Sequence, residues 1–127
     1  MSDLDAFRAE ISEWIDAHAP DVLRGTREGR FDGFWGGRNP VDVKPGAREW
    51  LQAALTRGLT APHWPARYGG GGLSYAHGQV FDDELRKREL PPPLVGFGLA
   101  MIGPTLLDFG TEAQREQHLP SILRGDI

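Results

Sequence analysis

Apolar residues recur every three or four positions near the start of the chain, which is the spacing of one face of an α-helix. The positions are Leu4, Phe7, Ile11, Trp14, Ile15 and His18. They predict an amphipathic helix over residues 3–18. Pro20 ends or interrupts this helix, because proline has no N–H for the next helical hydrogen bond. Residues 21–24 are candidates for a short extension after the break.

Two further helices are predicted in the middle of the chain. Pro45 is placed to begin the first, which has one apolar face and Gly58 just past its end. The apolar residues of that face are Trp50, Leu51, Ala54 and Leu55. Ser74 can cap the second helix over residues 75–90, and the prolines at 91–93 end it.

The last part of the chain predicts one more helix. Thr111 and Gln114 have the spacing of a capping box, which opens a helix over residues 112–118. Pro120 then begins a short turn up to Gly125. Because no segment alternates apolar and polar residues as a strand does, we expect an all-α fold. The helix count favours a single-domain orthogonal or up-down helical bundle of about five or six helices.

Composition and charge exclude several classes of protein. The chain has no cysteine, which excludes disulfides and cysteine nucleophiles and is compatible with the cytoplasmic location that we expect. A formal net charge of −4 argues against a protein that binds nucleic acid by neutralising phosphates. No apolar stretch reaches the roughly 18 residues that a membrane span needs. We therefore expect neither a nucleic-acid partner nor a membrane span.

The segment Gly25–Lys44 shows no sustained periodicity and is typical of a long loop. Its aromatic residues, Phe31, Phe34 and Trp35, are candidate anchors. Basic and aromatic residues alternate in it, as they do in loops that bind nucleic acid, but acidic residues dilute the pattern. We favour a loop that packs on its own domain or on a partner chain, with nucleic-acid binding as the alternative.

The run Gly69–Gly72 precedes a predicted helix, and a glycine-rich loop at a helix N-terminus can bind phosphate. A dinucleotide fingerprint also needs a preceding strand, and a P-loop needs a lysine, and both are missing here. The alternative is a turn that uses backbone angles open to glycine. We favour the turn.

No set of side chains in the sequence predicts catalysis or metal binding. The four histidines lack the spacing of a zinc motif. The serines lie at helix caps or within helical segments, without the sharp turn that presents a nucleophilic serine. Glu84 lies among apolar positions of its helix, so we expect it to be a partly buried anchor for an arginine and not a catalytic base.

The stretch 94–107 is the most apolar part of the chain, and Pro104 interrupts or restarts it. Four residues of this stretch fall on one helical face: Leu94, Phe97, Gly98 and Met101. Two interpretations stay open. The face is packed core, with glycines that allow close helix contact, or it is the wall of an apolar ligand channel.

Two motifs together resemble the N-terminal helical domain of the acyl-CoA dehydrogenases. The first comprises Trp64-Pro65, Tyr68-Gly69-Gly70 and Gly72-Leu73-Ser74, followed by a helix with Asp83-Glu84-Leu85. The second comprises Gly103-Pro104, Phe109-Gly110-Thr111-Glu112, Gln114-Arg115, Leu119-Pro120 and Gly125-Asp126. The resemblance covers most of residues 4–127, and the order and spacing of the pieces make it specific. The run of four glycines is longer than the usual pattern.

The resemblance implies a larger protein with an N-terminal α domain, a middle β domain and a C-terminal α domain. Residues 1–127 are expected to be the first of these, with the other two absent. The family binds FAD mainly between the two absent domains, and its catalytic glutamate usually lies in the last one. We therefore assign no catalytic and no cofactor-binding residue, and we expect this domain alone to be inactive and to hold no FAD.

The resemblance also implies a reaction and partners. Such enzymes oxidise the Cα–Cβ bond of an acyl-CoA to a 2-enoyl-CoA and pass the electrons to an electron-transfer flavoprotein, commonly as a homo-oligomer. The segment that resembles the wall of the acyl pocket supplies five candidate substrate residues: Leu94, Phe97, Gly98, Met101 and Ile102. The length of the acyl chain is left open. The alternative is a stand-alone helical docking module, whose exposed apolar face is a permanent interface with a partner.

Overall fold

The computed structural model describes residues 3–27, 34, 45–95 and 98–126. All regular structure in this part of the chain is helical, which confirms the predicted all-α fold. The elements are α1 (Asp3–His18), η1 (Asp21–Leu23), α2 (Ala47–Leu55), η2 (Ala66–Tyr68), α3 (Tyr75–Lys87), η3 (Gly98–Ile102), α4 (Gly103–Phe109) and α5 (Glu112–Leu123).

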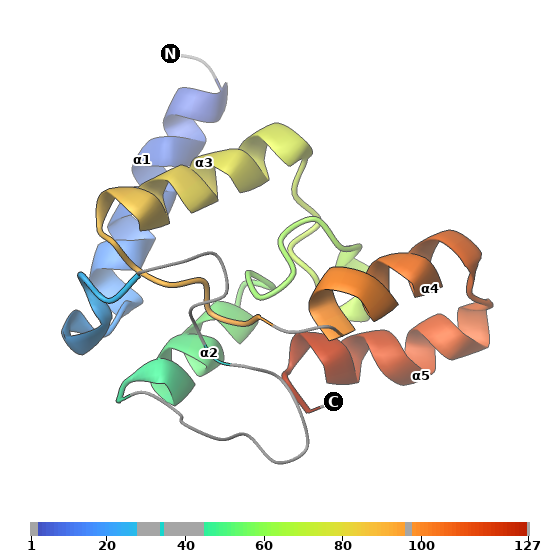
Figure 1. Ribbon diagram of the computed structural model, residues 1–127. Coiled ribbons are helices and arrows are strands. Elements are labelled where there is room, and N and C mark those ends of the chain that lie inside the picture. Colours follow the sequence, from blue (N-terminus) through green and yellow to red (C-terminus); the bar gives the residue numbers. More distant parts are fainter. Residues whose placement is uncertain (1–2, 28–33, 35–44, 96–97, 127) are drawn as a thin grey trace.

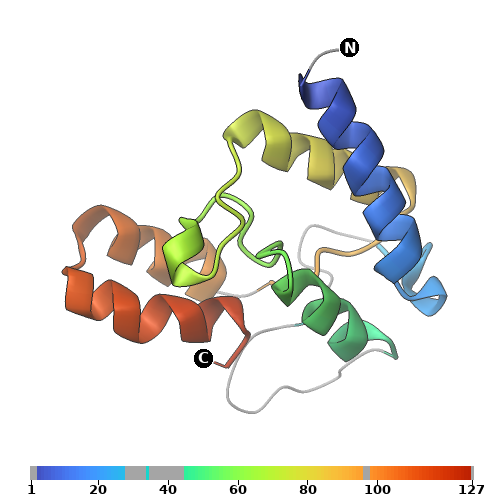
Figure 2. The same ribbon diagram turned by 180° about the vertical axis from the view of Figure 1, so that it is seen from behind.

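The helices form two groups (Figure 1). In one group α1 crosses α3 and packs against it, and in the other α4 and α5 lie side by side. The view from behind shows the segment 56–74, which joins α2 to α3, running through the middle of the molecule between the two groups (Figure 2). The segment that carries the Trp64–Ser74 motif is therefore central to the fold.

A hydrophobic core joins α1, α2 and α3. Ile11 and Ile15 of α1 are fully buried against Leu85 of α3 and Trp50 of α2. The ring centroids of Trp50 and Trp14 lie 5.6 Å apart. The indole N–H of Trp50 donates to the carbonyl of Pro91 at 3.0 Å, so this large side chain is buried with its polar atom satisfied.

The start and end of the first predicted helix are confirmed, but the helix predicted over 75–90 is too long. α3 ends at Lys87, well before the prolines. The N–H of Leu90 donates to the carbonyl of Leu85 at 2.9 Å, and Glu89 has a φ of 51°, so a left-handed residue closes the helix. Glutamate is a poor sequence signal for this conformation, which is why the prediction missed it.

The helix predicted over 112–118 is too short, because α5 continues through Pro120 to Leu123. Proline in a helix interior leaves the carbonyl four residues earlier without its usual donor. Leu119, Ile122 and Leu123 are all buried in one cluster, and this burial outweighs the lost hydrogen bond. Tertiary packing therefore overrides the local signal for a turn.

The apolar stretch 94–107 divides at Gly103. Residues Gly98–Ile102 form a π-helical turn, and α4 follows with Pro104 in its first turn, so the predicted restart is confirmed. The hydroxyl of Thr105 donates to the carbonyl of Met101 at 2.8 Å and ties the two elements together. Single π-helical turns are rare and are frequent at functional sites.

Of the predicted loop Gly25–Lys44, the structure describes residues 25–27 and Phe34. Phe34 is buried with Leu51 and Leu94, as expected for an aromatic anchor that packs on its own domain. Phe31 and Trp35 lie outside the described residues.

Candidate functional site

The glycine run is a packed turn and not a phosphate site. Each of its four N–H groups donates to a carbonyl of the neighbouring loop. The acceptors of Gly69, Gly70, Gly71 and Gly72 are Ala66, Pro65, Ala61 and Trp64, at 2.9, 3.2, 3.1 and 2.9 Å. Because a phosphate is held by free N–H groups, the phosphate interpretation is excluded and the turn is confirmed.

Two of these glycines are required by their surroundings. Gly69 has a φ of 99°, and a Cβ atom there would lie 2.9 Å from a methyl carbon of Leu123. A Cβ atom on Gly70 would overlap the backbone and side chain of Trp64. The run is therefore glycine-rich because the chain approaches itself and α5 closely.

The two motifs that carried the family resemblance meet in space. The hydroxyl of Tyr68 donates to a carboxylate oxygen of Glu112 at 2.8 Å, and Arg67 reaches the same oxygen at 3.2 Å. Trp64 and Tyr68 share a buried cluster with Leu119, Ile122 and Leu123. The predicted capping box of Thr111 and Gln114 opens α5 and is confirmed. These motifs serve to dock α5 on the central loop.

Glu84 is a buried anchor for cations, as predicted. Its carboxylate lies 2.7 Å from Arg8 and from Lys87, and 3.3 Å from Arg88. Burial on its own raises the pKa of Glu84, but hydrogen bonds from Lys87, Arg8 and Arg88 outweigh it and hold the pKa at about 2. A carboxylate that stays ionised and fully paired is a poor proton acceptor, so Glu84 stabilises the fold and is no catalytic base.

Three polar side chains near the start of α3 form a hydrogen-bonded series. The hydroxyl of Ser74 lies 2.6 Å from Nδ1 of His77, and Nε2 of His77 lies 2.7 Å from a carboxylate oxygen of Asp3. The series contains the residue types of a hydrolase triad. However, Ser74 Oγ is the helix cap that accepts the N–H of His77, and none of the three lines the cavity described below. We assign the series to joining α1 and α3.

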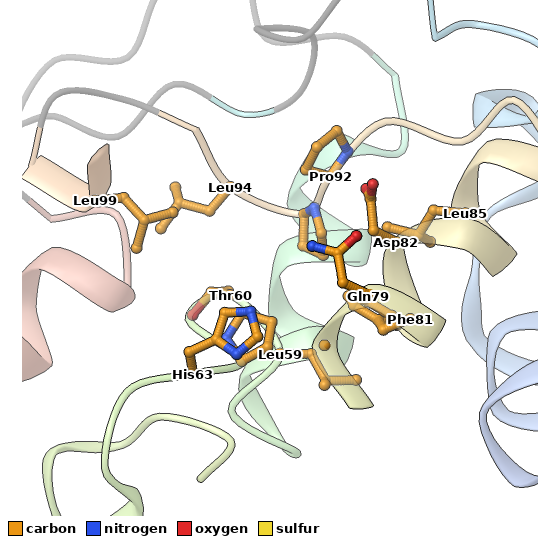
Figure 3. Close-up of a pocket in the computed structure, with 13 residues that line it drawn as sticks. Leu59, Thr60, His63, Gln79, Phe81, Asp82, Leu85, Pro92, Leu94 and Leu99 are labelled. Carbon is orange, nitrogen blue, oxygen red and sulfur yellow. The ribbon is translucent and has the colours of Figure 1, made fainter. Parts of the chain in front are cut away.

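A cavity of about 290 Å³ lies between α3, the loop that follows α2, and the segment before η3 (Figure 3). Its lining is mostly apolar and includes Leu59, Phe81, Leu85, Leu94 and Leu99. Polar side chains of Thr60, His63, Gln79 and Asp82 complete it. An apolar concavity with a few polar groups is the usual form of a small-molecule site, and this volume is at the lower end of the usual range.

The five predicted pocket residues are not gathered at this cavity. Leu94 lines it and is buried. Met101 and Ile102 lie on η3 with 61% and 54% of their surfaces exposed. Gly98 begins η3, and Phe97 lies outside the described residues. Met101 and Ile102 are therefore free to contact another domain or a ligand, whereas Leu99 of the same turn lines the cavity.

Periodicity did not identify Thr60, His63 and Gln79 as lining residues. Thr60 and His63 lie in an irregular loop, and Gln79 lies on the exposed side of α3. These three residues line one cavity only because the loop folds over α3, and no local sequence pattern encodes that fold.

The described residues also bear on metal binding and on membrane crossing. No group of three or more histidine, cysteine or acidic side chains is arranged to hold a metal ion in this part of the chain. Among the same residues, no helix combines the length and apolar character that a bilayer crossing requires.

Fold and cavity together define an all-helical domain with a mostly apolar cavity among its described residues. The chain matches the family described as "Acyl-CoA dehydrogenase, N-terminal domain" over residues 2–126. It belongs to this family, and the resemblance inferred from the two motifs is confirmed.

Two similar proteins are named acyl-CoA dehydrogenases. The chain is 34% identical to acyl-CoA dehydrogenase IpdE1 of Mycolicibacterium smegmatis over 123 residues, which are 97% of this chain and 30% of the relative. It is also 34% identical to IpdE1 of Mycobacterium tuberculosis over 122 residues, 96% of this chain and 30% of that protein. The chain thus spans about a third of the length of these relatives.

Solved structures support the fold. The "Tcur3481-Tcur3483 steroid ACAD" aligns with a TM-score of 0.62 and 31% identity over 98% of this chain and 29% of that one. The ChsE4-ChsE5 complex from Mycobacterium tuberculosis aligns with a TM-score of 0.65 and 24% identity, over 100% of this chain and 29% of that one. The second match bears on the fold alone.

Proposed function

We propose that this chain is the N-terminal domain of a longer, FAD-dependent acyl-CoA dehydrogenase. The complete enzyme oxidises the Cα–Cβ bond of an acyl thioester to a 2-enoyl thioester. This domain contributes one wall of the acyl pocket and is inactive alone. The observation that carries the proposal is the family match across residues 2–126, in a chain that spans about a third of its relatives.

The acyl wall is formed in this proposal by residues of η3 together with Leu94 and Phe97. Met101 and Ile102 are apolar and more than half exposed, which is costly in water unless something covers them. The π-helical turn departs from regular α geometry at the same place. Leu94, Phe97, Gly98, Met101 and Ile102 remain the residues that we propose to contact the acyl group.

Neither the glycine run nor Glu84 offers a free group to FAD. The glycine run has donated all its N–H groups within the protein, and Glu84 is fully engaged with cations. We therefore propose that the middle and C-terminal domains of the parent hold the cofactor and supply the base.

We extend the proposal to the substrate class and the assembly. Similarity to a steroid ACAD supports a polycyclic acyl group as substrate. That structure carries two protein names. It supports an oligomeric parent, and it favours a partner chain of a different sequence over the homo-oligomer expected from the family resemblance. An electron-transfer flavoprotein is the proposed electron acceptor.

The test is the ultraviolet-visible spectrum of the full-length protein before and after anaerobic addition of acyl-CoA thioesters of several classes. We expect a flavin band that bleaches with a suitable thioester. A protein that purifies without flavin, or flavin that no acyl-CoA reduces, would contradict the proposal.

The second candidate is a docking module without catalysis. It is favoured by the exposed side chains of Met101, Ile102 and Phe109, the last with 86% of its surface exposed. The sequence that follows Ile127 in the gene separates the two candidates. A flavin-binding β domain there supports the enzyme, and a stop codon supports the module.

A further inference from the structure

The end of α4 is held by a side chain of the helix that follows it. The Nε–H of Arg115 on α5 donates to the carbonyl of Leu106 at 3.0 Å, and its Nη2–H donates to the carbonyl of Leu107 at 2.8 Å. The last four carbonyls of an α-helix have no donor inside the helix, and the helix dipole favours a cation beside them. One guanidinium of α5 therefore bonds two carbonyls at the end of α4.

α4 needs contacts of this kind because it is short. It has 7 residues, and an isolated helix of that length is not stable in water. Its side chains Leu106 and Leu107 pack against the cluster that contains Leu119, but they are only partly buried. The two hydrogen bonds from Arg115 therefore help to fix where α4 lies on α5, the pair of helices seen side by side in Figure 1.

The position of α4 in turn determines the position of η3. The chain passes from Ile102 directly into Gly103 with no loop between the two elements. The hydroxyl of Thr105 on α4 donates to the carbonyl of Met101 on η3 at 2.8 Å. Met101 and Ile102 are the exposed residues of the proposed acyl wall. A shift of α4 on α5 would therefore move the wall with it.

We infer that Arg115 is a positioning residue of the proposed dehydrogenase. It acts through α4 and not by contact with the substrate, because its hydrogen bonds hold α4, and with α4 the acyl wall, in place. Its other charged neighbour, Glu112, is 4.0 Å away, so the two carbonyls are its closest partners. The inference rests on the proposed function and adds to it a residue outside the wall that sets the position of the wall.

The experiment uses the full-length flavoenzyme with Arg115→Met, which keeps an unbranched side chain and removes the donors. The measurement is kcat/KM for a polycyclic acyl-CoA and for the shortest acyl-CoA that the wild type oxidises. We expect kcat/KM to fall about tenfold for the polycyclic substrate and less than about twofold for the short one. A misplaced wall costs rate only to the extent that the acyl group contacts it.

Two further arginine variants serve as controls. Arg124→Met is the matched one, because Arg124 follows α5 and bonds Ser121 and Asp126 instead of α4. It should keep the wild-type ratio of the two kcat/KM values. Arg115→Lys restores a cation that can donate to the end of α4, so it should recover part of the preference for the polycyclic substrate.

Hydrogen exchange of the same full-length proteins tests the position of α4 without turnover. We expect Arg115→Met to speed exchange of the α4 amides by about tenfold, since a helix end that loses its capping bonds opens more often. Exchange of the α3 amides should stay as in the wild type. Thr105→Val breaks the link between α4 and Met101 and should shift the kcat/KM ratio in the same direction.

The outcomes separate this inference from the proposed function. If no acyl-CoA reduces the flavin of the wild type, the proposed function is wrong and the inference falls with it. An unchanged kcat/KM ratio in Arg115→Met, or α4 exchange equal to that of the wild type, would overturn the inference and leave the dehydrogenase proposal in place. If Arg115→Met does not fold, an unchanged ratio in Thr105→Val overturns it.

Discussion

Glu84 illustrates how a single buried charge holds two helices together. Its side chain is 5% exposed, and its three cationic partners come from α1 and from the end of α3. Arg88 extends the network to Asp16 of α1 at 2.9 Å, and hydrogen bonds from Arg88 and Arg24 lower the pKa of Asp16 to about 2. Taking a carboxylate out of water is unfavourable unless such partners are present.

Replacing Glu84 with glutamine leaves these cations without their anion. We expect Glu84→Gln to lower the free energy of unfolding at pH 7 by about 2–3 kcal/mol, less than for a fully buried pair because Arg8 and Lys87 are partly exposed. Urea unfolding followed by tryptophan fluorescence measures it. Asp83→Asn is the matched control, since Asp83 is half-exposed and its one cation, Arg8, is 3.7 Å away.

The pH dependence of this contribution has a definite sign. The pKa of Glu84 falls from 4.5 to about 2 on folding, so the unfolded chain binds the proton more tightly. The stabilisation is therefore complete above pH 4.5 and is lost as the pH falls towards 2. The difference between wild type and Glu84→Gln should shrink over that interval. A difference that stays constant down to pH 2 would show that charge is not its cause.

Residue-scale prediction worked for Glu84 and failed for Thr60. The apolar neighbours of Glu84 lie within its own helix, so a helical pattern was enough to indicate burial. Thr60 is buried at a cavity that it shares with residues distant in sequence, such as Leu94 and Phe81. Its unpartnered hydroxyl could be recognised only after the loop was placed against α3.

At the scale of elements, helix ends were predictable where a local signal determines them. Ser74 caps α3, and Thr111 caps α5 through its capping box. Gly58 has a φ of 68° and closes α2, as its position past the apolar face indicated. In each case the side chain or the missing Cβ acts on backbone groups within a few residues.

The end of α2 also shows how an element is held against its neighbour. A Cβ atom on Gly58 would overlap the backbone of Gly70, whereas one on Gly72 would lie 3.6 Å from the nearest atom, the Cβ of Ala66. Both glycines have a positive φ, 68° and 62°. The pair therefore separates the cost of the backbone conformation from the cost of lost contact space.

We expect Gly72→Ala to destabilise the protein by about 1–2 kcal/mol, the cost of a left-handed alanine. Gly58→Ala should cost more than about 3 kcal/mol, because the loop must also move away from α2. Thermal and urea unfolding of the two variants provide the comparison. Equal losses would mean that the close approach of Gly58 to Gly70 contributes little to stability.

At the scale of the whole molecule, three of the large apolar side chains that are exposed among the described residues lie on η3 and α4. Met101 and Ile102 lie on η3 and Phe109 ends α4, away from the core shared by α1, α2 and α3. Exposed apolar surface gathered on neighbouring elements marks a place where another surface or a ligand binds. In the proposed parent this surface faces the acyl group and the other domains.

We expect Met101→Ala in the full-length enzyme to change substrate preference and not stability. An exposed side chain contributes less than about 0.5 kcal/mol to folding. The added space at the acyl wall should shift the kcat/KM ratio of a bulky to a small acyl-CoA by about tenfold towards the bulky one. Val22→Ala is the control, because Val22 is 57% exposed on η1 and outside the acyl wall. An unchanged ratio in Met101→Ala would remove Met101 from the wall.

The sequence by itself determined the helical class, most helix starts and the family of this protein. These properties rest on periodicity, caps and motif spacing, which act over a few residues or are recognised in order along the chain. Tertiary structure decided the passage of α5 through Pro120, the close packing of the glycine run and the gathering of Thr60, His63 and Gln79 at one cavity. Each of these depends on burial against residues far away in sequence, whose free energy exceeds local preferences and leaves no local pattern.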